Sequence, residues 1–409
     1  MDSGRGARRA WKAFARYGRD YAVRFALAFL LAVAAYSAAE FWTLRNWDSE
    51  ESLVVEIVDV GSEKILSAEP GSGGDEGGEG DGGEPFQTAE TEIAARILTG
   101  EQQGRVFSGS VTRMKSGGVE PEKGRRYILF TDTFEDGSMQ YSIADAFRAP
   151  AVAGAVVFAC ACLTAFAGRA GAKALLGLAL SVAALLWGLV PLLSRGVPPV
   201  PAAFAAVVFI AGATVLCVVR RGRRAVPFLG TLGGTAGAFL LGRLMVEFWH
   251  LSGLAGENAP LLASTLPGID IRGILLASVV VGAVGAVLDV SVSITAALSE
   301  LAEHNPGIAL FDLWASGLRV GTEVLGSMIN TLILAYLGTS LPTTILISSA
   351  GADFWGLMND PYVGQEIVHS AAGTSGLLLT IPITAACFAL REKFLAPRGG
   401  NCRAGFDKK

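Results

Sequence analysis

Three polar side chains, Asp289, Glu323 and Asn330, lie inside two long apolar stretches that flank a short polar link within residues 282–341. A carboxylate inside a membrane segment is unfavourable, so it usually faces the interior of a helix bundle or a water-filled pathway. These residues are the first candidates for chemistry in the chain. The other elements are interpreted as the scaffold that positions them.

Helical spacing groups further polar residues with these three. On a helix, positions i, i+4, i+7 and i+11 share one face, and this spacing defines a polar face on each of the two segments. The candidates for a pathway or an ion-coupling site are Asp289, Ser293, Glu300, Glu323, Ser327 and Asn330. At about 1.5 Å per residue, Asp289 lies about 27 Å along its segment and Asn330 about 15 Å along the next. The two faces are therefore expected to meet in the inner half of the bilayer.

The oxygen atoms of these side chains are hard ligands, which suit a proton, Na⁺ or another hard cation better than a soft metal. A structural role is the alternative, because Asn and Ser also hydrogen-bond between membrane helices. Cys160 and Cys162 are interpreted as small helix residues rather than metal ligands. His304 has no nucleophile nearby, and His369 is interpreted as incidental. We predict no metal site and no cofactor.

The composition predicts a multi-pass membrane protein. The chain has 409 residues, of which 51% are hydrophobic and only 17% charged, whereas a soluble domain carries nearer a quarter charged residues. Apolar runs of about 20 residues, enough to span a bilayer, recur along the chain. The expected spans are residues 21–41, 151–168, 175–193, 202–219, 227–249, 271–290, 320–347 and 373–390.

A β-rich region is expected to follow the first span. Residues 42–148 contain five short runs rich in β-branched and aromatic residues, bounded by turn residues. They are predicted to close a small OB-like barrel. Residues 69–84 are acidic and Gly-rich, a composition typical of a flexible loop that folding does not need. Residues 43–146 hold 9 Lys and Arg against 21 Asp and Glu, which does not suit a nucleic-acid backbone.

The fold class predicted is therefore an all-α polytopic bundle of about eight transmembrane helices, with an extracytoplasmic β-rich domain inserted after the first. In order, the expected domains are a basic N-terminus (1–20), the first helix (21–41), the β-rich domain (42–148), a seven-helix membrane domain (149–390) and a basic tail (391–409). Lys and Arg favour the cytoplasmic side. The four arginines within residues 220–224 and the basic ends therefore place both termini in the cytoplasm of a cell-membrane protein.

Two local patterns concern the fifth span. Gly230 and Gly234 are four residues apart, as are Gly233 and Gly237, and this spacing lets helix backbones approach closely in lipid. Arg243 and Glu247 follow at the outer end of the same span, with the i, i+4 spacing of an ion pair on one face. They are interpreted either as a neutralised interfacial pair or as the outer mouth of a pathway.

Two motifs resemble the YibE/F family of bacterial membrane proteins. They are the run GAVGAVLDVSVSITAALSEL and the run MINTLILAYLGTSLP, and weaker similarities extend from YSIADAFR to the last span. The family pattern has a G-R-D-like triplet where this chain has Gly321, Thr322 and Glu323. The carboxylate is kept and the arginine is missing, so a role that needs the cation does not carry over. The resemblance implies the membrane architecture and leaves the activity open.

The leading functional hypothesis is a transporter or permease-type protein with a polar site between the sixth and seventh spans. The alternative is an assembly, envelope-maintenance or sensing component whose external domain binds a partner. An intramembrane enzyme is disfavoured, because the sequence lacks the P-loop, dinucleotide, H-E-x-x-H and G-x-S-x-G motifs. We found no inverted repeat of the kind common in transporters. Expected partners are the bilayer, a proton or hard cation and a small solute, with a homo-oligomer left open.

The orientation can be tested with single cysteines introduced within residues 220–224 and labelled with a membrane-impermeant maleimide on intact cells. We expect no labelling there, and labelling of a cysteine introduced between residues 42 and 148, because the arginine-rich loop is predicted to be cytoplasmic. Labelling of the arginine-rich loop from outside would contradict the predicted topology.

Overall fold

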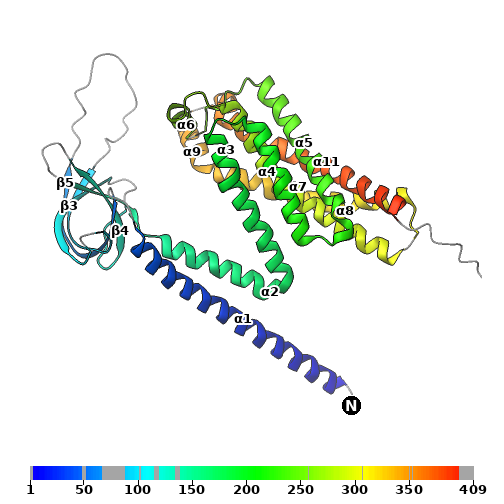
Figure 1. Ribbon diagram of the computed structural model, residues 1–409, viewed down its shortest axis with the longest axis horizontal. Helices are drawn as coiled ribbons and strands as arrows, with labels where there is room; N and C mark the ends of the chain where they lie inside the picture. The colour runs from blue at the N-terminus through cyan, green and yellow to red at the C-terminus, as the bar shows by residue number, and fades with distance from the viewer. Residues whose placement is uncertain are drawn as a thin grey trace, which may run out of the picture. The chain divides into compact units, whose positions relative to one another are not determined.

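A computed structural model describes residues 3–47, 52–66, 88–100, 103–114, 119–133, 139–256, 258–305, 307–349, 351 and 353–395. The acidic stretch 69–84 and the end of the basic tail lie outside these residues. The chain divides into two compact units, Met1–Gly171 and Ala172–Lys409. Figure 1 shows a small barrel in the first unit and a helical bundle in the second.

Two long helices belong to the first unit. Helix α1 (Ser3–Arg45) is apolar over Val23–Arg45, and helix α2 (Ala149–Ala183) begins in this unit and ends in the second. They pack where Gly154 leaves room for the α1 backbone, since a methyl group there would lie 3.3 Å from the carbonyl oxygen of Ala32. The rings of Phe25 and Phe158 meet edge to face at 5.5 Å.

The barrel is a closed sheet of five strands. They are β1 (Ser52–Leu66), β2 (Thr88–Ile97), β3 (Val106–Met114), β4 (Arg126–Thr133) and β5 (Met139–Ala146), in the order β1-β2-β3-β5-β4. The β3–β5 pair is parallel and the other pairs are antiparallel. The prediction of a small five-stranded barrel after the first helix is confirmed.

Alternation of apolar and polar residues explains why these strands curl around one core. Ile57, Ile93 and Leu129 are almost fully buried inside the barrel, while their strand neighbours face outward, as a period of two requires. Tyr127 is also buried, and its hydroxyl donates to the carbonyl oxygen of Glu120 at 2.8 Å. That bond satisfies the polar group that the core would otherwise leave without a partner.

The barrel is tied to α1 at the point where the helix ends. The guanidinium of Arg126 on β4 forms an ion pair with the carboxylate of Glu40 on α1. The indole Nε1 of Trp47 donates to the carbonyl oxygen of Ser52 at 3.0 Å, and the Trp47 ring lies edge to face with that of Phe147 at 6.0 Å. The barrel is thus held at a fixed position against the end of its own helix.

The second unit is a bundle of long helices with short connecting ones. After α2, a π-helical turn (Ala184–Leu189) leads into α3 (Val190–Ser194). The remaining helices are α4 (Pro199–Val218), α5 (Ala225–Phe248), α6 (Ala259–Thr265), α7 (Ile271–His304), α8 (Leu310–Thr339), α9 (Leu341–Ser349), α10 (Phe354–Asn359) and α11 (Pro361–Leu395). A 3₁₀ turn (Arg221–Arg223) joins α4 to α5.

Seven helices of the described chain are long and apolar enough to cross a membrane, where the sequence predicted eight spans. The difference lies in one stretch of 46 residues, Ala149–Ser194, which contains both predicted spans 151–168 and 175–193. At about 1.5 Å per residue a straight helix of this length would be about 69 Å long, roughly twice the hydrocarbon thickness of a bilayer. It is not straight, because Gly168 has φ 57° and ψ −133°, which no helix residue adopts.

Several predicted spans differ from the helices at their ends. The span predicted at 271–290 is helix α7, which continues to His304. The span predicted at 320–347 is helix α8, which begins ten residues earlier, at Leu310, and α9, which starts after a break at Ser340. The last helix, α11, begins at Pro361 rather than near 373. Its first turns contain Gln365, Glu366 and His369. These polar residues lower the local hydropathy, so the predicted span begins after them.

Helices α5 and α11 approach each other through glycines, as the four-residue spacing predicted. A methyl group at Gly230 or Gly234 would collide with the hydroxyls of Thr384 and Thr380. One at Gly233 would lie 2.8 Å from Ile383 Cδ1. The prediction of close packing at this motif is therefore confirmed.

Buried hydroxyl groups join α5 to α7 on the other side of the same helix. Thr231 Oγ1 and Ser291 Oγ lie 2.9 Å apart and both residues are fully buried. Around them, Val287 and Ile294 of α7 and Phe388 of α11 form the largest apolar cluster of the bundle. Helix α7 therefore lies at the centre of the unit, covered on most of its faces.

The glycine contact predicts that Gly234→Ala lowers the thermal stability of the purified protein in detergent. The added methyl group must displace Thr380 and the backbone of α11, and overpacking of this kind typically costs about 1–3 kcal/mol. Gly326→Ala is the matched control, because no atom of the described residues lies within 4 Å of a methyl group placed there. Alanine also favours a helix over glycine by about 1 kcal/mol. Equal melting temperatures for the two variants would contradict the close contact.

Candidate functional site

One face of helix α7 carries a continuous line of small, polar or ionisable residues, here called the α7 stripe. Its members are three or four residues apart, so all of them share a face. The stripe consists of Ser278, Gly282, Gly285, Asp289, Ser293, Ala296, Glu300 and His304, and all eight are exposed. From Ser278 to His304 it extends about 39 Å, which exceeds the hydrocarbon thickness of about 30 Å. The opposite face of α7 is buried, and the positions beside the stripe are partly buried.

At one end of the stripe, α7 contacts aromatic side chains of α8 and α11. Ser278 Oγ lies 2.9 Å from His369 Nε2 of α11, and the His369 ring stacks on Tyr336 of α8 with centroids 5.7 Å apart and an interplanar angle of 14°. Gly282 makes room for Tyr336, because a methyl group there would lie 2.5 Å from the tyrosine hydroxyl oxygen. His369, interpreted from the sequence as incidental, thus connects three helices.

A carboxylate with a buried oxygen lies next to this cluster. Glu366 precedes His369 by three residues on α11, which places both on neighbouring positions of one face. In the part of the chain that the structure describes, Glu366 Oε2 and Gln365 Nε2 are buried without a hydrogen-bond partner. The i, i+3 spacing of Glu366 and His369 is the signal that could have identified this group from the sequence.

The middle of the stripe contains Asp289, the central residue of the sequence-based site. Its side chain is exposed, and within the described residues it forms no hydrogen bond or ion pair. Two contacts fix the register of the antiparallel helices α7 and α8, namely Gly282 with Tyr336 and Leu298 with Gly317. Counting residues between these contacts places Asp289 of α7 level with Ser327 of α8 along the helix axes.

The predicted α8 residues lie at this depth but on a different surface. By the same register Ser293 is level with Glu323, while Asn330 lies about one turn from Asp289. Glu323, Ser327 and Asn330 are all exposed, on the side of α8 opposite the residues that pack on α11, such as Gly321 against Ile381. Among the described residues, no hydrogen bond or ion pair joins the α8 set to the α7 stripe.

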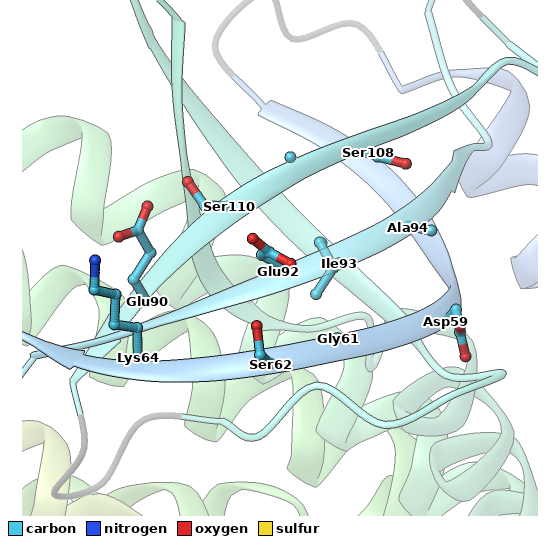
Figure 2. Close-up of a pocket in the computed structure, with 11 residues that line it drawn as sticks. Asp59, Gly61, Ser62, Lys64, Glu90, Glu92, Ile93, Ala94, Ser108 and Ser110 are labelled. Carbon is cyan, nitrogen blue, oxygen red and sulfur yellow. The ribbon is translucent and has the colours of Figure 1, made fainter.

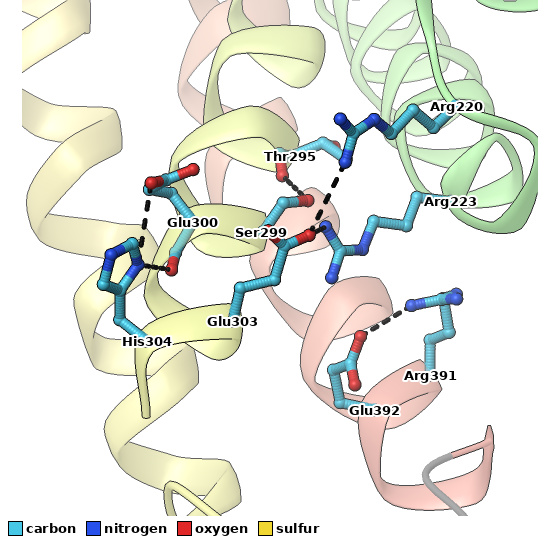
Figure 3. A network of polar contacts seen from close by, with 9 residues as sticks. All are labelled: Arg220, Arg223, Thr295, Ser299, Glu300, Glu303, His304, Arg391 and Glu392. Carbon is cyan, nitrogen blue, oxygen red and sulfur yellow. Dashed lines mark hydrogen bonds and ion pairs between the residues drawn. The ribbon is translucent and has the colours of Figure 1, made fainter. Parts of the chain in front are cut away.

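At the other end of the stripe the ionisable groups are paired, as Figure 3 shows. Glu303 Oε1 lies 2.9 Å from Arg223 Nη1 and 3.8 Å from Arg220 Nη1. Glu300 and His304 contact each other, with His304 Nδ1 3.6 Å from Glu300 Oε1. A cavity of about 330 Å³ lies beside them, lined by the charged ends of these arginines and glutamates and by Thr295 and Ser299. The arginine-rich loop and the C-terminal end of α7 therefore meet at the same end of the bundle.

The C-terminal end of α11 lies there as well. The guanidinium of Arg223 sits 5.8 Å above the ring of Phe388, and Arg391 Nη1 lies 2.6 Å from Glu392 Oε1. In Figure 3, Arg220, Arg223 and Arg391 lie along one side of the cluster. Positive charge is thus gathered at one end of the bundle.

The predicted pairing of Arg243 with Glu247 is wrong. Glu247 Oε2 instead lies 3.6 Å from Nη2 of Arg272, which also donates to the carbonyl oxygen of Val246 at 3.2 Å. Arg243 is exposed and forms no ion pair within the described part of the chain. The i, i+4 rule describes one helix only, and here the neighbouring helix α7 presents a nearer cation.

A second, unrelated depression lies on the outer surface of the barrel. It has a volume of about 680 Å³ over β1, β2 and β3, and Asp59, Glu90, Glu92 and Lys64 line it together with small residues. Figure 2 shows these side chains projecting from neighbouring strands. Gly61 opens the surface, since a methyl group there would lie 3.1 Å from Glu92 Cβ. The depression is polar and mainly acidic.

The comparisons with known proteins match the membrane part of the chain. A family model described as "YibE/F-like protein" matches residues 155–393, more than half of the chain, from α2 to the end of α11. No curated protein and no solved structure matches the chain.

The aromatic end of the stripe makes a prediction for the chemical reactivity of the three histidines. Diethyl pyrocarbonate should modify His369 more slowly than the exposed His250 and His304, because His369 is covered by Tyr336 and its Nε2 contacts Ser278. Gly282→Ala should raise the rate at His369 several-fold, since the methyl group displaces Tyr336.

Gly285→Ala is the matched control on the same face of α7. No atom of the described residues lies within 4 Å of a methyl group there, so the modification rate should stay at the wild-type value. Mass spectrometry of each histidine peptide gives the three rates. An unchanged rate at His369 in Gly282→Ala would show that Tyr336 does not cover it.

Proposed function

The chain belongs to the YibE/F-like family, and we propose that it is a permease-type transporter of the bacterial cell membrane that couples the movement of a small solute to a proton or hard cation. The observation that carries this proposal is the α7 stripe, which extends over about 39 Å of a helix otherwise buried in an apolar bundle. Ionisable side chains in membrane helices mark ion and substrate pathways. A helix that served only for packing would not need a carboxylate such as Asp289 within its apolar length.

The order of groups along the stripe suits the passage of a proton. His369 lies at one end, Asp289 is in the middle, and Glu300 and His304 are at the other end. An imidazole ring nitrogen can donate or accept a proton, and both ends carry such a ring. Asp289 is the proposed intermediate site, with Ser293 beside it and Glu323, Ser327 and Asn330 as further polar positions on α8.

The proposed topology has eight spans with both termini in the cytoplasm and the barrel outside. In this arrangement the two parts of the Ala149–Ser194 helix, which Gly168 separates, cross the membrane individually. The meeting of Arg220, Arg223 and Arg391 at one end of the bundle supports a cytoplasmic location for that end. The aromatic end of the stripe then faces outward.

The acidic depression on the barrel favours one alternative function. A surface of about 680 Å³ lined by Asp59, Glu90 and Glu92 could hold a basic segment of a partner protein in the envelope. In that case the bundle would serve as an anchor for an assembly or sensing component. The reconstituted chain would then show no proton flux, and deleting the barrel would abolish the protein's effect in the cell.

Asp289→Asn tests the proposed coupling directly. The purified chain is reconstituted in liposomes that contain pyranine, and a potassium diffusion potential drives protons inward. We expect acidification with the wild-type protein and at least a tenfold slower rate with Asp289→Asn, because the amide keeps the size and the hydrogen bonding of the side chain but cannot carry a proton.

Asp312→Asn provides the matched control, since Asp312 is an exposed carboxylate on α8 outside the stripe. Its rate should equal that of the wild-type protein. Wild-type flux in Asp289→Asn would rule out charge-dependent coupling at this residue. Loss of folded protein together with flux would assign Asp289 a structural role, where a membrane hydrogen bond contributes only about 0.6 kcal/mol on average.

A further inference from the structure

The aromatic end of the stripe borders a large cavity in the bundle. It has a volume of about 660 Å³ and lies between α8, α9, α10 and α11. Its walls are mainly apolar and include Leu337, Met358 and Ala371. This size is within the range of about 300–1,000 Å³ typical of small-molecule sites, which are mostly apolar with a few polar groups that orient the ligand.

One charged group reaches this apolar surface. Among the described residues that line the cavity, Glu366 alone carries a charge, and its Oε2 atom is buried without a hydrogen-bond partner. A buried carboxylate oxygen without a partner is unfavourable, and a ligand that brings a positive charge close to it reduces this penalty. The cavity therefore has an unsatisfied preference for a cation.

The surrounding charge has the same sign. Residues 353–370, which form α10 and the first part of α11, contain Asp353, Asp360 and Glu366 and neither Lys nor Arg. The side chains of Asp353 and Asp360 accept hydrogen bonds from backbone N–H groups at the starts of these two helices. An anionic ligand would meet repulsion at this end of the cavity, whereas a cation would be attracted.

Two tyrosines line the cavity with Glu366. Tyr336 and Tyr362 are both part of its wall, and the face of an aromatic ring attracts a cation within about 6 Å. The position of Tyr336 is fixed by the His369 ring and by the space at Gly282. Aromatic rings beside one carboxylate suit an organic cation better than a small hydrated ion, because they replace its hydration with apolar contact.

We propose that this cavity binds a monovalent organic cation with a large apolar body, whose charge lies against Glu366. The inference names the substrate class of the transport proposed above and rests on that function for the movement of the ligand, but binding can be measured without movement. A lipid acyl chain in the cavity would leave the carboxylate without a partner, and it is the occupant against which the test discriminates.

The probe is tetraphenylphosphonium, an apolar monovalent cation. Equilibrium dialysis of the radiolabelled probe against the full chain in dodecyl maltoside should give saturable binding. Glu366→Gln should raise Kd at least tenfold, because the amide retains the shape of the side chain and removes the charge. Asp312→Asn should bind with the wild-type Kd, since Asp312 lies on α8 and does not line the cavity.

Two further measurements distinguish the contribution of charge to probe binding from that of apolar contact. One uses a neutral competitor, and the other uses a variant in which a side chain fills the cavity. Triphenylphosphine oxide, which has no net charge, should displace the probe at least tenfold less effectively than unlabelled tetraphenylphosphonium. Ala371→Phe should abolish binding of the probe by occupying the cavity, and it also provides a test if Glu366→Gln does not fold. Equal Kd values for Glu366→Gln and wild type, or equal competition by the neutral compound, would overturn the proposal.

The outcome also separates this site from the proposed transport. If the reconstituted wild-type protein shows no proton flux but binds tetraphenylphosphonium, the proposed transport is wrong and the proposed cation site still holds. If the wild-type protein shows proton flux, but wild type and Ala371→Phe bind the probe equally, the proposed cation site is wrong and the proposed transport still holds.

Discussion

The close approach of α5 and α11 is the contact on which the bundle depends. Gly230 and Gly234 present no side chain to α11, so the hydroxyls of Thr384 and Thr380 lie directly against the α5 backbone. In lipid there is little hydrophobic force between helices, and dispersion contacts at short backbone distance replace it. Because α11 also packs on α7 and α8 through Gly376, Ile381 and Ala385, this one contact sets the positions of the other central helices.

Helix α7 gains its unusual exposure from this arrangement. Three of its sides are covered by α5, α11 and neighbouring helices, with residues such as Val287 and Ile294 fully buried. The fourth side is the stripe, where Gly285, Asp289 and Ser293 remain exposed. Burial of the hydroxyls of Ser291 and Thr295 on the packed side shows that hydroxyl groups serve as internal contacts there, whereas the carboxylate of Asp289 is kept apart from them.

The two ends of the bundle have opposite chemical character. One end gathers Arg220, Arg223 and Arg391 around Glu303 and Glu392. The other has Glu366 and two tyrosines in the wall of an apolar cavity, with His369 stacked on Tyr336. For the proposed transport, this asymmetry would give the pathway along α7 a direction, since a cation entering at the end with Glu366 and Tyr336 would meet these two residues first. The proposed transport and the proposed cation site depend on this same asymmetry.

The sequence by itself determined the elements that depend on local pattern. Short runs rich in β-branched and aromatic residues located the five strands, and hydropathy located the apolar parts of the membrane helices but not all of their ends. Glycine spacing indicated that α5 packs closely, although it did not name α11 as the partner. Only the tertiary structure decided which polar groups meet. The rotation and register of one helix against another are set by packing, which the period of a single helix does not fix, so Glu247 pairs with Arg272 rather than Arg243. For the same reason Ser278, Tyr336 and His369, from three separate helices, come together, while the α8 residues predicted to face Asp289 lie on another surface.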